Sequence, residues 1–312
     1  MKYYLTIDGG TTNTRLILME GITSVDRVKL PVGAGNTERA EVIRILHENI
    51  EKMLARHSLK IEDITAILAS GMITSEKGLC EVPHIAAPAG AAELHAHMHT
   101  VLIPELASLP VTFISGVRMM GETPETADIM RGEETELIGL QKQIGTGKKN
   151  TVFVLPGSHS KIIRVEDGRI VDFSTMLTGE MMAAVAHNTI LRDALDIKID
   201  DIDEAWLLRG YEYARDRGIN EALFKVRVLK NQLGAGLVER NSFFFGVILQ
   251  GEIDRIVEYG AECILIGGRA SFRIPMTSLL HRLTDTQIIP IEDEQADSAA
   301  SIGMILVYEH DN

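Results

Sequence analysis

Short apolar runs alternate with polar turns along the first third of the chain, and their lengths are those of β-strands. The predicted strands of this part cover residues 2–8, 14–19, 25–31, 65–69 and 111–115. Between Val42 and Leu54 apolar residues recur every three or four positions, which predicts an amphipathic helix. A second helix is expected over residues 88–99, with Pro88 near its first turn. The order βββαβαβ is typical of an α/β domain.

A second series of elements begins near residue 150. Its predicted strands cover residues 151–155, 162–165, 169–174 and 263–266, and its predicted helices cover residues 178–195, 202–217, 220–232, 236–258 and 294–310. Each half starts with a strand, a polar turn that contains glycine, and two more strands. The turn is GTTNTR in the first half and PGSHSK in the second, which indicates an internal duplication. Two such halves facing each other would form a cleft with one polar loop on each wall.

Composition narrows the class of protein. The chain has 312 residues, 45% of them apolar, which is enough for one large or two medium domains. A formal charge of −13 without a Lys/Arg cluster argues against nucleic acid as a partner. The sequence has no apolar run long enough to span a membrane and no secretory signal at its start, so we expect no membrane association. Cys80 and Cys263 lie in unlike contexts, which favours a reducing, cytoplasmic location.

The turn DGGTT at residues 8–12 is the first candidate for chemistry. A tight turn of glycine and hydroxyl residues directs backbone N–H groups toward one point, and such concave backbones bind phosphate oxygens. The hydroxyl groups of Thr11, Thr12 and Thr14 would add donors. Asp8 would hold Mg²⁺, directly or through water, because this ion prefers carboxylates and retains part of its water shell. The alternative interpretation is an ordinary β-hairpin turn.

Gly267, Gly268 and Arg269 form a second candidate, because they follow a predicted buried strand and open a helix. A nucleotide can approach the backbone closely at such a junction, where no side chain intervenes. Junctions of this kind also occur for structural reasons alone. The GGR turn therefore supports a nucleotide site only together with the two polar loops.

Six segments, in this order along the chain, resemble those of the 2-dehydro-3-deoxygalactonokinase family. They are IDGGTTNTR (7–15), SGMITS (70–75), IMRGEETELIG (129–139), LPGSHSK (155–161), FSTMLTGE (173–180) and IGGRA (266–270). The first, fourth and last resemble the two phosphate loops and the adenosine segment of the actin–hexokinase–Hsp70 superfamily. One departure is Gly9, which stands where the family commonly has tryptophan or another residue.

The resemblance implies an α/β fold of two RNase H-like, actin-like ATPase domains that flank a cleft for ATP and substrate, expected at residues 1–120 and 121–312. It also implies transfer of the γ-phosphoryl group of ATP, with Mg²⁺, to the 6-hydroxyl group of 2-dehydro-3-deoxygalactonate. A kinase of another sugar or sugar acid is the alternative within the superfamily. A non-catalytic, ATP-driven binding protein is a third hypothesis, which the chain length does not support.

The same resemblance implies which residues contact the ligands. Those expected at the nucleotide are Gly9, Gly10, Thr11, Thr12, Arg15, Gly157, Ser158, His159, Lys161, Gly267, Gly268 and Arg269. Those expected at the sugar acid are Ser70, Gly71, Met72, Thr74, Arg118 and Arg131. The two arginines are favoured for its carboxylate, because a guanidinium group meets a carboxylate at two points.

The acceptor hydroxyl also needs a base. In related sugar kinases an acid after a glycine at the junction of the domains accepts the proton, so Glu133 is favoured and Glu134 is the rival, with Asp8 as the third catalytic candidate. Acidic residues at a helix start also interact favourably with the helix dipole, and this structural alternative stays open for Glu133, Glu134 and Glu136. The expected partner is a small-molecule sugar acid; the oligomeric state is open, with a homodimer as one alternative.

Overall fold

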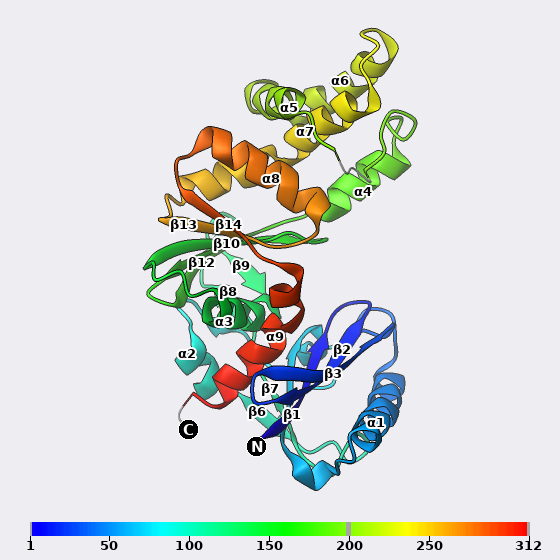
Figure 1. The fold of residues 1–312 in the computed structure, drawn as a ribbon, viewed down its shortest axis with the longest axis vertical. Helices are drawn as coiled ribbons and strands as arrows, with labels where there is room; N and C mark the ends of the chain where they lie inside the picture. The colour runs from blue at the N-terminus through cyan, green and yellow to red at the C-terminus, as the bar shows by residue number, and fades with distance from the viewer. Residues whose placement is uncertain (1, 198–200, 311–312) are drawn as a thin grey trace. The chain divides into compact units, whose positions relative to one another are not determined.

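The computed structural model describes residues 2–197 and 201–310 of the chain. It divides into two compact units (Figure 1). The first unit comprises Met1–Gly147, Gly168–Asp172 and Glu294–Asn312, and the second comprises Lys148–Asp167 and Phe173–Asp293. Each unit has its own β-sheet and its own apolar core.

The first unit is built on a six-stranded sheet with the strand order β3-β2-β1-β4-β7-β6. The bounds are β1 Tyr3–Gly9, β2 Thr14–Glu20, β3 Thr23–Leu30, β4 Ile64–Gly71, β6 His99–Val101 and β7 Val111–Phe113. Strands β1, β2 and β3 are antiparallel, whereas β4 runs parallel to β1. A smaller sheet has the order β5-β8-β9, with β5 at Ile85–Ala86, β8 at Val117–Met119 and β9 at Asp128–Met130.

Helices cover the sheet of the first unit. They are α1 Arg39–Arg56, α2 Ala91–Ala96, α3 Glu133–Ile144 and α9 Asp293–Tyr308, with short 3₁₀ turns at Ile61–Asp63 and Met72–Thr74. The apolar stripe of α1 is buried in one core with the β-strands, as its sequence period predicts. Helices α3 and α9 pack so closely that a Cβ atom on Gly139 or Gly303 would overlap the backbone of the other helix.

The second unit is built on a five-stranded sheet with the order β12-β11-β10-β13-β14, although residues 169–172 of β12 are grouped with the first unit. Its strands are β10 Asn150–Leu155, β11 Ser160–Glu166, β12 Arg169–Met176, β13 Cys263–Ile266 and β14 Gln287–Pro290. Its helices are α4 Thr178–Asn188, α5 Glu204–Arg217, α6 Ile219–Asn231, α7 Leu237–Glu258 and α8 Ala270–Leu283. The middle of α7 is buried on all sides, which places this helix at the centre of the second core.

The two sheets confirm the internal duplication. In each sheet the first strand along the chain pairs antiparallel with the next strand and parallel with the strand that follows the helical connection. The polar turns GTTNTR and PGSHSK join the first two strands in both cases. The fold class is therefore that of two RNase H-like, actin-like domains.

The unit boundaries differ from the predicted division into residues 1–120 and 121–312. Residues 121–147, and with them α3, belong to the first unit, and the chain returns to this unit in α9. The close contact of α3 with α9 explains the difference, because it packs two helices distant in sequence into one body. Local sequence patterns carry no sign of such a return.

Two predicted helices are shorter than expected. The helix over residues 88–99 is limited to Ala91–Ala96, because residues 99–101 form β6 and pair with β7. The helix over residues 178–195 ends at Asn188, because the hydroxyl group of Thr189 donates to the carbonyl oxygen of Val185 and accepts from the Leu191 N–H, which closes a turn.

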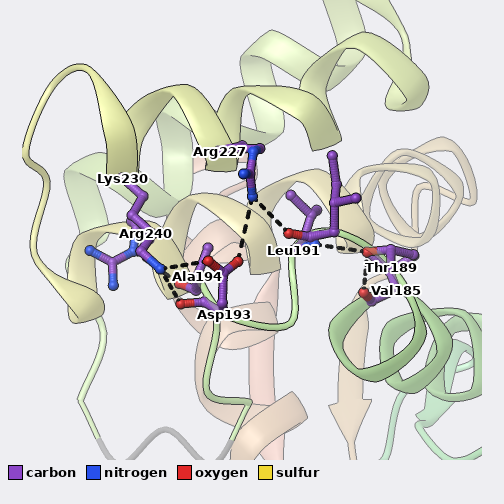
Figure 2. A network of polar contacts seen from close by, with 9 residues as sticks. Val185, Thr189, Leu191, Asp193, Ala194, Arg227, Lys230 and Arg240 are labelled. Atoms are coloured by element: carbon purple, nitrogen blue, oxygen red, sulfur yellow. Dashed lines mark hydrogen bonds and ion pairs between the residues drawn. The ribbon is translucent and has the colours of Figure 1, made fainter.

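Figure 2 shows how the chain after α4 is held in the second unit. The Lys230 ammonium group of α6 donates to the Asp193 carboxylate at 2.9 Å, and Arg227 pairs with the same carboxylate at 3.6 Å. From α7, the Arg240 Nε group donates to the carbonyl oxygen of Ala194 at 2.9 Å. Side chains of α6 and α7 thus donate hydrogen bonds to a segment whose backbone is not paired with a β-strand.

Candidate active site

The first polar loop is a tight hairpin turn at the ends of β1 and β2. Asp8 lies directly opposite Arg15 in the ladder, and the Arg15 Nη1 atom lies 3.2 Å from the Asp8 Oδ2 atom. The N–H group of Gly10 donates to the carbonyl oxygen of Asn13 at 2.8 Å and closes the turn. Residues 11–13 are exposed at its tip.

Three glycines bring the carboxyl ends of β1 and β4 against the start of α3. A Cβ atom on Gly71 would lie 2.5 Å from the carbonyl oxygen of Gly9, and a Cβ atom on Gly132 would lie 3.2 Å from the Gly71 Cα atom. Gly71 and Gly132 also have φ angles of +81° and +114°, which favour glycine. At Gly9 a Cβ atom would lie 2.5 Å from the Cβ atom of Ile73, which explains why glycine and not a larger residue stands at this position.

The acids of α3 occupy different environments. The Glu134 side chain is fully buried, and both of its carboxylate oxygens accept the Gly132 N–H at 2.8 Å. Glu133 is half-buried, and its Oε2 atom accepts the Arg131 N–H at 3.0 Å. Burial and the Glu133 charge raise the pKa of Glu134 to about 8. Glu134 therefore fits the structural alternative, in which an acidic side chain accepts an N–H group at the start of the helix.

Glu136, one turn into α3, is coupled electrostatically to the hairpin. Burial raises its pKa to about 8, and the charges of Asp8 and Glu133 add to the increase while Arg15 opposes it. Burial also raises the pKa of Asp8, again against the effect of Arg15. Asp8, Glu133 and Glu136 are thus coupled electrostatically, and we name these three side chains the acid cluster.

A divalent cation beside Asp8 would stabilise the ionised forms of Asp8 and Glu136, whose pKa values are both raised. Among residues 2–197 and 201–310, no three His, Cys, Asp or Glu side chains converge as a ready-made metal site. Mg²⁺ does not need such a set, since it is held through one or two carboxylates, water and substrate phosphates. Asp8, at the end of β1, is a partly exposed carboxylate beside the first polar loop.

Several residues expected to contact the sugar acid instead make hydrogen bonds within the protein. The hydroxyl group of Ser70 is buried and lies 3.1 Å from that of Thr135. Thr74 is buried, and the Arg131 Nη1 atom donates to its carbonyl oxygen at 2.7 Å. The Arg131 Nη2 atom donates to the carbonyl oxygen of Val82 at 3.0 Å. The Arg131 guanidinium group therefore holds the chain after β4. Met72 is more accessible than Ser70, Gly71 and Thr74.

His84 is a residue that the sequence analysis missed. The Arg131 Nη2 atom lies 3.1 Å from its Nδ1 atom. Because a guanidinium group only donates, Nδ1 must accept, and Nε2 carries the proton. Burial, Arg131 and Arg118 lower the pKa of His84 to about 4, so it is neutral near pH 7. A Cβ atom on Gly116 would lie 3.0 Å from the Nε2 atom, so the imidazole ring lies directly over Gly116.

Arg118 lies in β8, two residues after Gly116. It pairs with Ala86 in the ladder and its side chain is exposed. His84, two residues before Ala86, also lines an open cavity of about 460 Å³. The exposed Arg118 guanidinium group and the His84 imidazole, which directly precedes β5, are close enough to interact electrostatically.

The second polar loop is held in the second unit by α4. A Cβ atom on Gly179 would lie 2.2 Å from the carbonyl oxygen of Gly157, and the Glu180 N–H donates to the carbonyl oxygen of Ser158 at 3.2 Å. Lys161 is buried and donates to the Thr175 hydroxyl at 2.9 Å, whereas Gly157, Ser158 and His159 are more accessible.

The GGR turn lies against the same loop. Gly268 has a φ angle of +77°, and a Cβ atom on it would lie 3.0 Å from the carbonyl oxygen of Pro156. Gly267 donates its N–H to the carbonyl oxygen of Val154 at 2.9 Å, while Arg269 is exposed at the start of α8. The structure therefore brings residues 156–159 and 267–269 together, as a single nucleotide site would require.

One expected phosphate donor is occupied. The hydroxyl group of Thr14 is buried and donates to the carbonyl oxygen of Val32 at 2.7 Å, so it cannot face a ligand. Thr11 and Thr12 stay exposed. The prediction of three threonine donors was therefore wrong for Thr14. The sequence does not reveal this, because all three threonines belong to the same polar turn.

Comparison with solved structures defines the class of protein. The fold matches the crystal structure of a protein from Sinorhizobium meliloti, assigned as a 2-dehydro-3-deoxygalactonokinase, with a TM-score of 0.79 and 22% identity over 99% of both chains. It also matches the activator of 2-hydroxyisocaproyl-CoA dehydratase from Clostridium difficile with bound ADPNP, with a TM-score of 0.54 and 12% identity over 98% of this chain and 95% of that one. The protein therefore has the actin-like ATPase fold that sugar kinases share.

The family follows from the sequence comparison. The family model of 2-keto-3-deoxy-galactonokinase matches residues 8–305. The chain belongs to the 2-keto-3-deoxy-galactonokinase family and is a sugar-acid kinase, which confirms the resemblance noted above.

Two curated relatives carry the same name. The probable 2-dehydro-3-deoxygalactonokinase of Rhizobium meliloti is 29% identical over 195 residues, a match that spans 62% of this chain and 59% of the relative's own length. The 2-dehydro-3-deoxygalactonokinase of Escherichia coli is 24% identical over 266 residues, covering 83% of this chain and 82% of that protein. In the described part of the chain, no helix combines the length and apolarity that a bilayer crossing needs.

Proposed function

We propose that the protein transfers the γ-phosphoryl group of ATP to the 6-hydroxyl group of 2-dehydro-3-deoxygalactonate. Family membership and the names of both curated relatives support this substrate. The observation that carries the proposal is the meeting of Asp8 with the first turn of α3, beside a glycine-rich turn. Phosphoryl transfer depends on positioning and charge stabilisation rather than on covalent chemistry, and these residues can supply both.

Asp8 is proposed to hold Mg²⁺ through a carboxylate oxygen or a bound water. The raised pKa values of Asp8 and Glu136 support a cation at this place, because a positive charge there would stabilise both carboxylates. When bound, the ion neutralises charge on the transferring phosphoryl group. Arg15, paired with Asp8, favours the ionised carboxylate.

Glu133 is proposed to accept the proton of the acceptor hydroxyl. It lies in the first turn of α3, keeps part of its surface exposed and belongs to the acid cluster with Glu136. Glu134 is unsuited to this role, because its carboxylate is fully buried and bonded to the Gly132 N–H. Glu136 is proposed to support the cation site through its coupling with Asp8.

Each unit, taken by itself, has loop residues that are proposed to contact the nucleotide. In the first unit the donors are the N–H groups of Thr11 and Thr12, with Gly9 and Gly10 allowing close approach. In the second unit the residues are Gly157, Ser158, His159, Lys161, Gly267, Gly268 and Arg269. The contact of Gly268 with Pro156 supports the second set, because it joins the phosphate loop and the adenosine turn.

The sugar acid's carboxylate is proposed to bind Arg118 and the His84 Nε2–H. The protein carries a formal charge of −13, so an anionic substrate needs local donors. Arg131 is proposed to position His84 rather than to contact the substrate, because its guanidinium group already donates to the chain after β4. A homodimer and a cytoplasmic location stay predictions of the sequence.

ADP release with a panel of acceptors tests the proposal. The protein is incubated with ATP and Mg²⁺ and offered 2-dehydro-3-deoxygalactonate, its stereoisomers, other sugar acids and neutral sugars. Strong acceleration by the first compound supports the proposal. Acceleration by other sugars or acids alone would favour the alternative kinase, and slow turnover without response to any acceptor would favour the ATP-driven binding protein.

A further inference from the structure

Residues 32–36, which we name the backing segment, lie between β3 and α1 and contact the first polar loop. Four hydrogen bonds join the segment to residues 10–14. They are Ala34 N–H to Gly10 O at 3.1 Å, Gly35 N–H to Thr11 O at 2.8 Å, Asn36 Nδ2–H to Thr12 O at 3.1 Å and Thr14 Oγ1–H to Val32 O at 2.7 Å.

These bonds determine where the N–H groups of the loop point. In a trans peptide the C=O and N–H groups of one plane point in opposite directions. Fixing the carbonyl groups of residues 10–12 toward the backing segment therefore turns the N–H groups of Thr11, Thr12 and Asn13 away from it. Within the described residues, none of these three N–H groups has a hydrogen-bond acceptor.

The glycines of the backing segment allow this close approach. A Cβ atom on Gly33 would lie 2.6 Å from the Gly10 carbonyl oxygen, and one on Gly35 would lie 2.5 Å from the Thr11 Cγ2 atom. Neither glycine has a φ angle in the left-handed region. Their missing side chains are therefore explained by contact with the loop and not by backbone conformation.

Asn36 links the segment to itself and to the loop. Its Oδ1 atom accepts the Gly33 N–H at 2.8 Å and the Thr37 hydroxyl at 2.9 Å, while its Nδ2 group donates to Thr12. The side chain itself is exposed. Its contacts hold it in one orientation, and that orientation fixes the last of the three carbonyl groups.

We infer that the backing segment preforms the phosphate site of the first loop, with Asn36 and Gly35 as positioning residues that touch no substrate. This inference rests on the proposed function, because it assigns the three N–H groups to ATP phosphate oxygens. A preformed set of donors avoids the conformational cost of ordering the loop when the ligand binds. Loosening the segment should therefore weaken nucleotide binding and leave the sugar-acid site intact.

The test uses Asn36→Ala and Gly35→Ala in the full chain. Binding of the non-hydrolysable analogue ADPNP with Mg²⁺ is measured by calorimetry, and KM is measured separately for ATP and the sugar acid. We expect the Kd for ADPNP and the KM for ATP to rise about tenfold, with the KM for the sugar acid within about twofold of wild type. Both positions are exposed, so the variants should fold, and thermal unfolding checks this.

Matched controls carry the same substitutions elsewhere. Asn49→Ala removes an Nδ2 donor to the Ile45 carbonyl oxygen on α1, and Gly251→Ala adds a methyl group in open space on α7. Both controls should bind ADPNP as the wild type does. Folded Asn36 and Gly35 variants that bind ADPNP like the wild type, or that raise both KM values equally, would overturn the inference. Wild-type protein that binds no ADPNP would overturn the proposed function and this inference together.

Discussion

Gly71 lies against the backbone of Gly9, so that a methyl group at residue 71 would lie 2.5 Å from the Gly9 carbonyl oxygen. The ends of two neighbouring strands can therefore meet beside Asp8 only while position 71 has no side chain. The same contact continues to Gly132, which starts α3 and its acids. A chain of glycine contacts thus places carboxylates from distant parts of the sequence at one point.

Gly71→Ala should lower both stability and turnover, because the alanine is strained at φ +81° and collides with Gly9. We expect the free energy of unfolding to fall by about 2–4 kcal/mol. Denaturant unfolding and ADP release measure the two effects. Gly21→Ala is the matched control, since Gly21 has a φ angle of +57° but no atom near its Cβ position. Equal losses in both variants would show that strain alone matters.

Asp8→Asn should reduce turnover by about 10²–10³-fold, because it removes the charge proposed to hold the cation. Stability should not fall, since burial already disfavours the ionised form of Asp8. Steady-state kinetics and thermal unfolding check the two parts. Asp297→Asn, which breaks an exposed pair with Arg27 in the same unit, should leave both unchanged. Near-normal turnover in Asp8→Asn would refute the metal assignment.

Glu133→Gln and Glu134→Gln should have different effects. The first should reduce turnover by about 10²–10⁴-fold with little change in KM for either substrate, as loss of a general base does. The second should change thermal stability, because its carboxylate satisfies the Gly132 N–H in a buried position. If Glu133→Gln retains normal turnover, the proton acceptor is another group, and Glu136→Gln becomes the variant to measure.

Much of the fold could be predicted from the sequence. The main strands and α1 are long enough for their periodic pattern of apolar residues to be recognised. Strands β8 and β9 have three residues each, too few for any period, so the sheet that carries Arg118 was missed. The duplicated polar loops were visible as motifs. The return of α9 to the first unit was not, because only tertiary packing determines it.

Residues of the candidate site could be predicted where they belong to a sequence motif. They could not be predicted where their role depends on a contact with a residue distant in sequence. Asp8 and Glu133 stand in recognisable segments. Arg131 was assigned to the substrate because of its charge, yet its hydrogen bonds go to the chain after β4. His84 and Asn36 carry no local signal, since their roles come from partners 47 and 24 residues away.

Glu252 should make the stability of the protein depend on pH. It lies on α7, 1% exposed, and burial raises its pKa although the hydroxyl groups of Ser160 and Thr178 oppose this. A raised pKa means that folding favours the protonated form. The contribution to stability is therefore complete below about pH 4.5, the ordinary pKa of the group, and is lost as the pH rises through the folded-state pKa.

Glu252→Gln should remove this dependence, since the amide stays neutral. We expect the variant to gain stability relative to the wild type as the pH rises above 4.5, and thermal unfolding at a series of pH values measures it. Glu258→Gln, at an exposed position on the same helix, should show no such trend. Parallel profiles for wild type and Glu252→Gln would refute the assignment.

The most direct test of the central claim is the position of the phosphate on the product. Wild-type protein is incubated with ATP, Mg²⁺ and 2-dehydro-3-deoxygalactonate, and the product is examined by phosphorus–proton correlation NMR. We predict a phosphate ester that couples to the two protons of carbon 6, with one ADP formed per ester. Phosphate on any other carbon, or ADP formed without an ester, would contradict the account.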